Sequence, residues 1–141
     1  MKAACGCRLR VERRFSFANR KSSQRRHVES CEAWAGWITA IDADRGDVVW
    51  KRKLPAPVLG GVTPTAGGVV FAGDMLGNVY ALNASTGATV WRTQTSGAVG
   101  GGIVSYATPS QVQRIAVAAG MTSPIWPTAK VNAEIVVYGL K

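Results

Sequence analysis

Residues 77–91, GNVYALNASTGATVW, form the stretch on which the assignment of the fold depends. The apolar run at residues 79–82 leads into a turn cluster at residues 83–87, after which a second strand-like run ends at Trp91. Val, Tyr and Trp favour pleated strands, whereas Asn, Ser and Gly favour tight reversals. The stretch therefore predicts a β-hairpin whose loop contains a glycine.

A second copy of this hairpin signal lies at residues 36–50, GWITAIDADRGDVVW. The two copies align with a constant offset of 41 residues. The matched pairs are Ala40 and Ala81, Ile41 and Leu82, Asp42 and Asn83, Gly46 and Gly87, and Trp50 and Trp91. Hairpins that repeat at this period are typical of a β-propeller or a similar array, whose blades are four-stranded sheets.

The remaining strand signals continue the same pattern. Strands are expected at residues 37–42, 48–54, 61–65, 69–72, 79–83, 89–95, 102–107, 114–119 and 134–138. Their order corresponds to the last half of one blade, one complete blade and the first strands of a third. The 141 residues are too few for a closed propeller, which needs about four to eight blades of roughly 40 residues. We therefore predict an all-β fold, a partial β-propeller of about two and a half four-stranded blades.

Blade stacking explains the composition of the repeat. Each blade is covered on both faces by its neighbours, so its inner strands should be apolar on both faces rather than alternating. The small Ala40 and Ala81 leave room for the flat rings of Trp50 and Trp91. A buried indole N–H needs an acceptor, which we expect to be a carbonyl of the same turn. Gly46 and Gly87 allow the turns to adopt positive φ.

The basic character of the protein is concentrated in residues 1–33. This segment holds nine Lys/Arg and three Glu, whereas residues 34–141 hold eight Lys/Arg and five Asp/Glu. Its apolar residues show no period, so it cannot bury enough surface to offset its ordering entropy. We expect residues 1–33 to be a disordered or non-native leader, and residues 34–141 to be the propeller blades.

Other interpretations of residues 1–33 stay open. Their Arg- and Ser-rich composition also suits an organelle-targeting segment, and the abrupt change near Trp34 suits a shift of reading frame. A nucleic-acid-binding arm is less favoured, because no binding fold is recognisable, and we expect no nucleic-acid partner. Its basic residues would be Arg13, Arg14, Arg25 and Arg26. A metal site is also less favoured, because its Cys-x-Cys spacing is unusual. Its ligands would be Cys5, Cys7, His27 and Cys31.

Two further features bear on membranes and phosphate groups. No run approaches the roughly 18 apolar residues of a membrane span, and residues 1–33 contain no apolar core of a secretory signal. The glycine-rich residues 97–102, GAVGGG, could suggest a phosphate-binding loop. Such a loop opens a helix, whereas this one precedes a strand, so close backbone packing between blades is the favoured interpretation.

Residues 36–140 resemble the tryptophan-docking repeat of quinoprotein alcohol dehydrogenases, eight-bladed propellers that bind pyrroloquinoline quinone (PQQ). That repeat reads Ala-x-Asp-x-x-Thr-Gly-x-x-x-Trp. The first copy here has Arg45 in place of the Thr, and the second has Asn83 in place of the Asp. The phrases LPAPVLGGVTPTAGGVVFAGD, SGAVGGGIVSY and AAGMTSPIWP are also similar to that family, the last of them to its final blade. The resemblance does not reach residues 1–33.

The resemblance implies oxidation of small-molecule alcohols in the periplasm, with PQQ as electron acceptor and calcium or a lanthanide polarising the PQQ carbonyl. It also implies that the catalytic Asp and the metal ligands lie in earlier blades, so we assign no catalytic or metal-binding residue here. Trp126 is the one residue matched to the edge of the cofactor, and its alternative role is to pack the closing blade. The expected function is that of a fragment of a PQQ-dependent alcohol dehydrogenase, not active alone.

A non-enzymatic function is the alternative. The same blades could form a β-repeat scaffold or an outer-membrane assembly module that contacts other proteins. The loop at residues 120–132 distinguishes the two hypotheses, because a scaffold has no need for it. In either case the open blade edges favour self-association.

Overall fold

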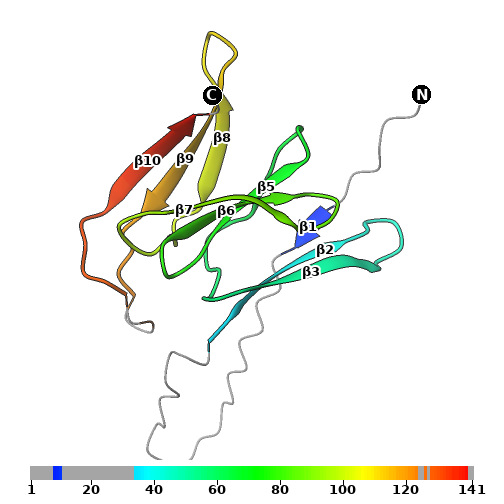
Figure 1. Cartoon of the computed structure of the whole chain (residues 1–141), viewed down its shortest axis with the longest axis horizontal. Helices are drawn as coiled ribbons and strands as arrows, with labels where there is room; N and C mark the ends of the chain where they lie inside the picture. Colours follow the sequence, from blue (N-terminus) through cyan, green and yellow to red (C-terminus); the bar gives the residue numbers. More distant parts are fainter. Residues whose placement is uncertain (1–7, 11–33, 124–125, 127, 140–141) are drawn as a thin grey trace, which may run out of the picture.

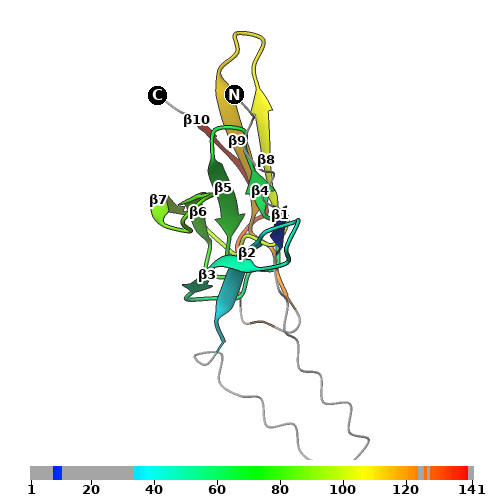
Figure 2. The ribbon, with the colours of Figure 1, turned by 90° about the vertical axis from the view of Figure 1, so that its right-hand side faces the viewer.

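The computed structural model describes residues 8–10, 34–123, 126 and 128–139, and these contain strands but no helix. The strands form three antiparallel sheets that follow one another in chain order, as the fan-like arrangement in Figure 1 shows. Figure 2, viewed from the side of the first sheet, shows the sheets one behind another. The predicted all-β partial propeller is therefore confirmed.

The three sheets have three, four and three strands. The first sheet contains β1 (Arg8–Arg10), β2 (Gly36–Ile41) and β3 (Val48–Leu54). The second contains β4 (Thr63–Pro64), β5 (Val69–Gly73), β6 (Asn78–Asn83) and β7 (Thr89–Gln94). The third contains β8 (Ile103–Ala107), β9 (Gln113–Ala119) and β10 (Glu134–Gly139). Each strand pairs with its neighbour in sequence, so the second sheet is one complete meander.

The two repeat copies have the same strand register. Ala40 lies opposite Trp50 in the β2–β3 pair, and Ala81 lies opposite Trp91 in the β6–β7 pair. Each pair has a register shift directly after that alanine. The two tryptophans therefore occupy equivalent places in successive sheets, as the 41-residue offset predicts.

The two hairpin turns are also equivalent. The side-chain oxygen of Asp42 accepts hydrogen bonds from the backbone N–H groups of Asp44 and Arg45. Asn83 accepts from the two corresponding N–H groups of its own turn. The side-chain oxygens of Asp and Asn therefore accept the same two hydrogen bonds in this turn, which explains why the first copy has Asp42 where the second has Asn83. Gly46 and Gly87 have φ values of 79° and 70°, which confirms the predicted positive φ.

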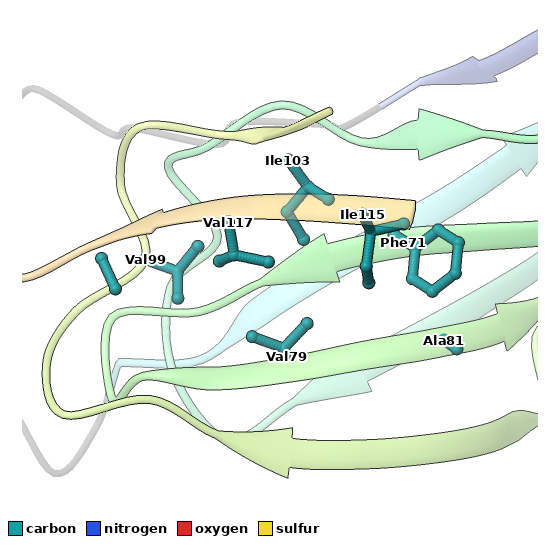
Figure 3. Packing of buried hydrophobic residues seen from close by; sticks show 8 residues of the cluster. Phe71, Val79, Ala81, Val99, Ile103, Ile115 and Val117 are labelled. Carbon is teal, nitrogen blue, oxygen red and sulfur yellow. The ribbon is translucent and has the colours of Figure 1, made fainter. Parts of the chain in front are cut away.

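The second sheet is apolar on both faces because each face packs against a neighbouring sheet. Toward the first sheet, Val70 and Leu82 pack with Ile38 and Leu54. Toward the third sheet the packed residues, shown in Figure 3, are Phe71, Val79, Ala81, Val99, Ile103, Ile115, Val117 and Ala119. The second sheet is therefore packed between the first and the third through buried apolar side chains on both of its faces.

Two details differ from the strand predictions. β4 is only two residues long, because Pro64 has no N–H with which to extend the ladder. Within the basic segment, residues 8–10 form β1 and pair with the free edge of β2. The other residues of the segment lie outside the described residues.

The far face of the third sheet has no neighbouring sheet within the described part of the chain. Its apolar side chains are exposed, with Ile135 75% and Val137 52% accessible. Val104 and Tyr106 are exposed as well. The fold therefore ends in an open apolar face rather than in a polar cap.

Candidate functional site

Trp50 joins the first sheet to the second. Its indole N–H donates a 2.8 Å hydrogen bond to the carbonyl of Ala84, in the turn after β6. The ring also lies against Gly87, where an added Cβ would come within 2.6 Å of the indole. The expectation of an acceptor in the same turn is therefore wrong. The reason is that the Trp50 side chain points toward the second sheet and not toward its own turn. In its own turn, the carbonyls of Asp42 and Asp47 already accept backbone hydrogen bonds.

Trp91 has a different environment, although it has the same place in its own sheet. Its ring meets that of Tyr138 edge to face, with centroids 5.3 Å apart and planes at 73°. The residue stays 39% exposed. Trp91 therefore lies against a strand of the third sheet, whereas Trp50 lies in a turn of the second.

A buried carboxylate lies at the start of the β5–β6 connection. Asp74 is fully buried, and its oxygens accept hydrogen bonds from the backbone N–H groups of Leu76 and Asn78. The Asn78 side-chain amide and the Tyr80 hydroxyl also donate to it. The residue types alone did not reveal this role, although Gly73-Asp74 before Gly77-Asn78 suits a tight connection. Because these donors already satisfy the Asp74 carboxylate, its role here is structural.

Tyr80 and Arg92 complete this polar cluster. Burial raises the pKa of Tyr80 first of all, and the hydrogen bond to Asp74 raises it further. The Arg92 guanidinium donates a 2.7 Å hydrogen bond to the side-chain oxygen of Asn78 and lies 5.5 Å from the Tyr80 ring. The cluster stabilises the second sheet and leaves no free base for acid–base chemistry.

Trp126 lies in the loop between β9 and β10. It is half-buried, and its backbone N–H donates to the hydroxyl of Ser123 at 3.1 Å. The indole meets the ring of Trp34 edge to face and packs beside Met121 on a small buried cluster. The buried members of that cluster are Ala56, Met75 and Ala98. Trp126 therefore has a packing role, and its predicted contact with a cofactor stays a prediction.

The described residues do not fit a metal site. They contain no group of three or more His, Cys, Asp or Glu side chains that could hold an ion. Asp74 is satisfied by hydrogen bonds, and backbone N–H donors from Arg45 and Asp44 lower the pKa of Asp42 in its turn. The alternative site built from the cysteines and His27 lies outside the described residues.

The glycine-rich residues 97–102 provide close packing. A Cβ at Gly101 would come within 2.8 Å of the Ala118 side chain. One at Gly97 or Gly100 would overlap the side chain of Val131 or Met121 respectively. The absence of side chains at these glycines therefore allows close packing of the backbone in this segment.

The described residues contain no helix of the length and apolarity that crossing a membrane requires.

Stacked antiparallel sheets with a repeated hairpin register, one of them a complete four-stranded meander, define a β-propeller repeat protein. A family model described as outer membrane protein assembly factor BamB matches residues 35–129. The chain belongs to this family of propeller repeats.

Sequence relatives fall into two groups. The quinoprotein alcohol dehydrogenase PedH of Pseudomonas putida is 38% identical over 97 residues, which cover 67% of this chain and 16% of PedH. The outer membrane protein assembly factor BamB of Escherichia coli is 38% identical over 73 residues, covering 45% of this chain and 18% of that protein. The chain thus spans less than a fifth of either relative.

Solved structures agree with the first group. A europium-containing methanol dehydrogenase matches with a TM-score of 0.58 and 31% identity over 62% of this chain and 15% of its own. Over about two thirds of its length, the chain is therefore a relative of quinoprotein alcohol dehydrogenases.

Proposed function

We propose that residues 34–141 supply the C-terminal blades of a PQQ-dependent alcohol dehydrogenase. The observation that carries this proposal is the 38% identity to the quinoprotein alcohol dehydrogenase PedH, extended over 97 residues. The tryptophan pair supports it further, because Trp50 links successive sheets as a docking residue would. The open face at Ile135 and Val137 suits a piece that packs against more blades.

The chain alone has no alcohol-oxidising activity in this proposal. Its described residues hold no set of metal ligands, and its buried Asp74 is committed to structural hydrogen bonds. PQQ, with calcium or a lanthanide, would be bound mainly by other blades. Trp126 would add one apolar wall at the edge of the cofactor, from a loop where it is half-buried. The substrate would be a small alcohol and the location the periplasm.

Reconstitution tests this proposal. PedH lacking the region that matches this chain would be produced with and without the full 141-residue chain, and PQQ- and ethanol-dependent dye reduction would be measured. We expect activity only when both polypeptides are present. Trp126→Ala should raise the PQQ concentration needed for half-maximal activity. A chain that neither binds the shortened PedH nor restores oxidation would contradict the proposal.

A scaffold function is the second candidate, because the matching family model carries the BamB description and Escherichia coli BamB is 38% identical over 73 residues. The loop that contains Trp126 separates the two. A scaffold would keep its protein contacts when residues 122–130 are replaced by a short Gly-Ser linker. A dehydrogenase blade would lose its contribution to PQQ binding in the same variant.

A further inference from the structure

A cavity of about 360 Å³ opens between the second and third sheets. Phe71 and Ala81 form its wall on the second sheet, and Ile115 and Tyr138 form its wall on the third. Figure 3 shows Phe71 and Ile115 facing each other at the end of the packed cluster. The cavity thus continues the apolar interface to the point where the two sheets separate. Its size is within the range of small-molecule sites, about 300–1,000 Å³.

The strand register decides which side chains of the third sheet face this cavity. Tyr138 lies directly opposite Ile115, and both side chains pack toward the second sheet. Arg114 precedes Ile115 in the same strand and lies opposite Gly139, so its side chain is on the other face of the sheet, against Gly139. The other lining residues contain no Asp, Glu, Lys or Arg. The walls of the cavity are therefore uncharged.

Trp91 adds an aromatic ring to the wall on the second sheet. It lies opposite Ala81, and its ring meets that of Tyr138 edge to face. The equivalent Trp50 instead has its N–H bonded to Ala84 in the turn of the next sheet. The Trp91 indole lines the cavity, and its N–H has no acceptor among the described residues. A flat aromatic ligand beside these two rings gains stacking and edge contacts in addition to apolar burial.

Gln113 adds a neutral polar group on the same face of the third sheet as Ile115. Its side-chain amide donates a 2.9 Å hydrogen bond to the hydroxyl of Ser105. The side-chain oxygen of Gln113 accepts no hydrogen bond from a described residue, so it is available to a ligand hydroxyl. No positive charge is present to pair with a carboxylate, and burying an unpaired carboxylate costs far more than burying a hydrogen-bonded hydroxyl.

We propose that this cavity binds a small, flat, uncharged aromatic molecule that carries one hydroxyl group. The ring would lie between Phe71, Ile115 and Trp91, and the hydroxyl would donate to the side-chain oxygen of Gln113. The cavity lies within one chain, so this proposal does not depend on whether the protein completes a dehydrogenase.

Equilibrium dialysis of the full chain against 2-naphthol at pH 7 tests the proposal, and this method does not require a monomer. The matched ligand is 2-naphthoate, which has the same ring system with a carboxylate in place of the hydroxyl. We expect the Kd for 2-naphthol to be at least tenfold lower than that for 2-naphthoate. Absence of 2-naphthol binding would overturn the proposal, and so would 2-naphthoate binding that is equal or tighter.

Two variants locate the bound ligand. Trp91→Ala removes an aromatic wall and should raise the Kd for 2-naphthol about tenfold. The matched control is Trp37→Ala, which should leave the Kd unchanged, because Trp37 has the same 39% exposure but lies in the first sheet. An equal effect of the two substitutions would place the ligand outside the cavity and overturn the proposal.

A third variant tests the cavity if Trp91→Ala fails to fold. Val69→Phe places a larger side chain in the cavity and should weaken 2-naphthol binding more than tenfold, with an unchanged circular dichroism spectrum. Arg114→Gln is the control within the third sheet, and it should leave the Kd unchanged because that side chain lies on the other face. Retained affinity in a folded Val69→Phe variant would contradict binding in the cavity.

Discussion

The indole N–H of Trp50 is hydrogen-bonded at 2.8 Å to the carbonyl of Ala84, 34 residues further along the chain and in a different sheet. The hydrogen bond connects the outer strand of one blade to the turn of the next. Because the ring also contacts Gly87, a single side chain fixes both the spacing and the register of two sheets. A repeat of this kind couples neighbours rather than stabilising each blade separately.

We expect Trp50→Phe to lower the free energy of unfolding by about 2 kcal/mol, because the hydrogen bond and part of the ring contact are lost. Trp91→Phe is the matched control at the equivalent place. Since Trp91 is 39% exposed, its substitution should cost less than about 1 kcal/mol. Urea denaturation followed by circular dichroism measures both. If both substitutions lowered the free energy of unfolding equally, the hydrogen bond between Trp50 and Ala84 would make no measurable contribution to stability.

Gly87→Ala should destabilise the protein more than Gly46→Ala does. Both glycines have positive φ, so each substitution costs about 1–2 kcal/mol of backbone strain. Only at Gly87 would the new Cβ meet Trp50, whereas at Gly46 it would meet no atom within 4 Å. The difference between the two urea midpoints therefore reports the contact between the sheets. Indistinguishable midpoints would contradict the close approach of Trp50 to Gly87.

Asp74→Asn should lower the free energy of unfolding by about 3 kcal/mol. The substitution places an NH₂ group among donors that now point at carboxylate oxygens, including the Tyr80 hydroxyl and the Asn78 amide. The matched control is Asp47→Asn in an exposed turn, which should change stability by less than about 0.5 kcal/mol. Thermal denaturation of the two variants provides the measurement, and a small effect at Asp74 would rule out a structural carboxylate.

Tyr80 should make the protein sensitive to alkali. Its pKa is raised in the folded state, so above the ordinary tyrosine pKa of about 10 only the unfolded state loses this proton. Folding stability should then fall as the pH rises, by up to about 1.4 kcal/mol per pH unit. Tyr80→Phe should remove this part of the slope between pH 9 and 11, whereas Tyr106→Phe, at an exposed residue, should retain it. If the free energy of unfolding of Tyr80→Phe fell with pH as steeply as that of the wild type, Tyr80 would not be the group responsible for the alkaline sensitivity.

The strands and turns could be predicted from the sequence because their signals are local. The predicted strand at residues 48–54 has the bounds of β3, and both turn glycines have the expected positive φ. The hydrogen-bond acceptor of Trp50 could not be predicted, because it depends on how two sheets stack. Trp126 was found through a family resemblance, and its packing against Trp34 and Met121 gives that residue a second reason to be apolar.

Self-association should follow from the open face of the third sheet. Ile135 and Val137 project from the edge strand β10, where unpaired backbone groups and exposed apolar side chains together favour contact with another chain. We expect the full chain, expressed alone, to be insoluble or oligomeric by sedimentation. The double substitution Ile135→Glu and Val137→Glu should increase the monomer fraction. Glu in place of the exposed Leu76, which lies in the β5–β6 connection and not on an edge strand, is the control and should not. A monodisperse wild-type monomer with a sharp two-state thermal transition would show that the face needs no partner.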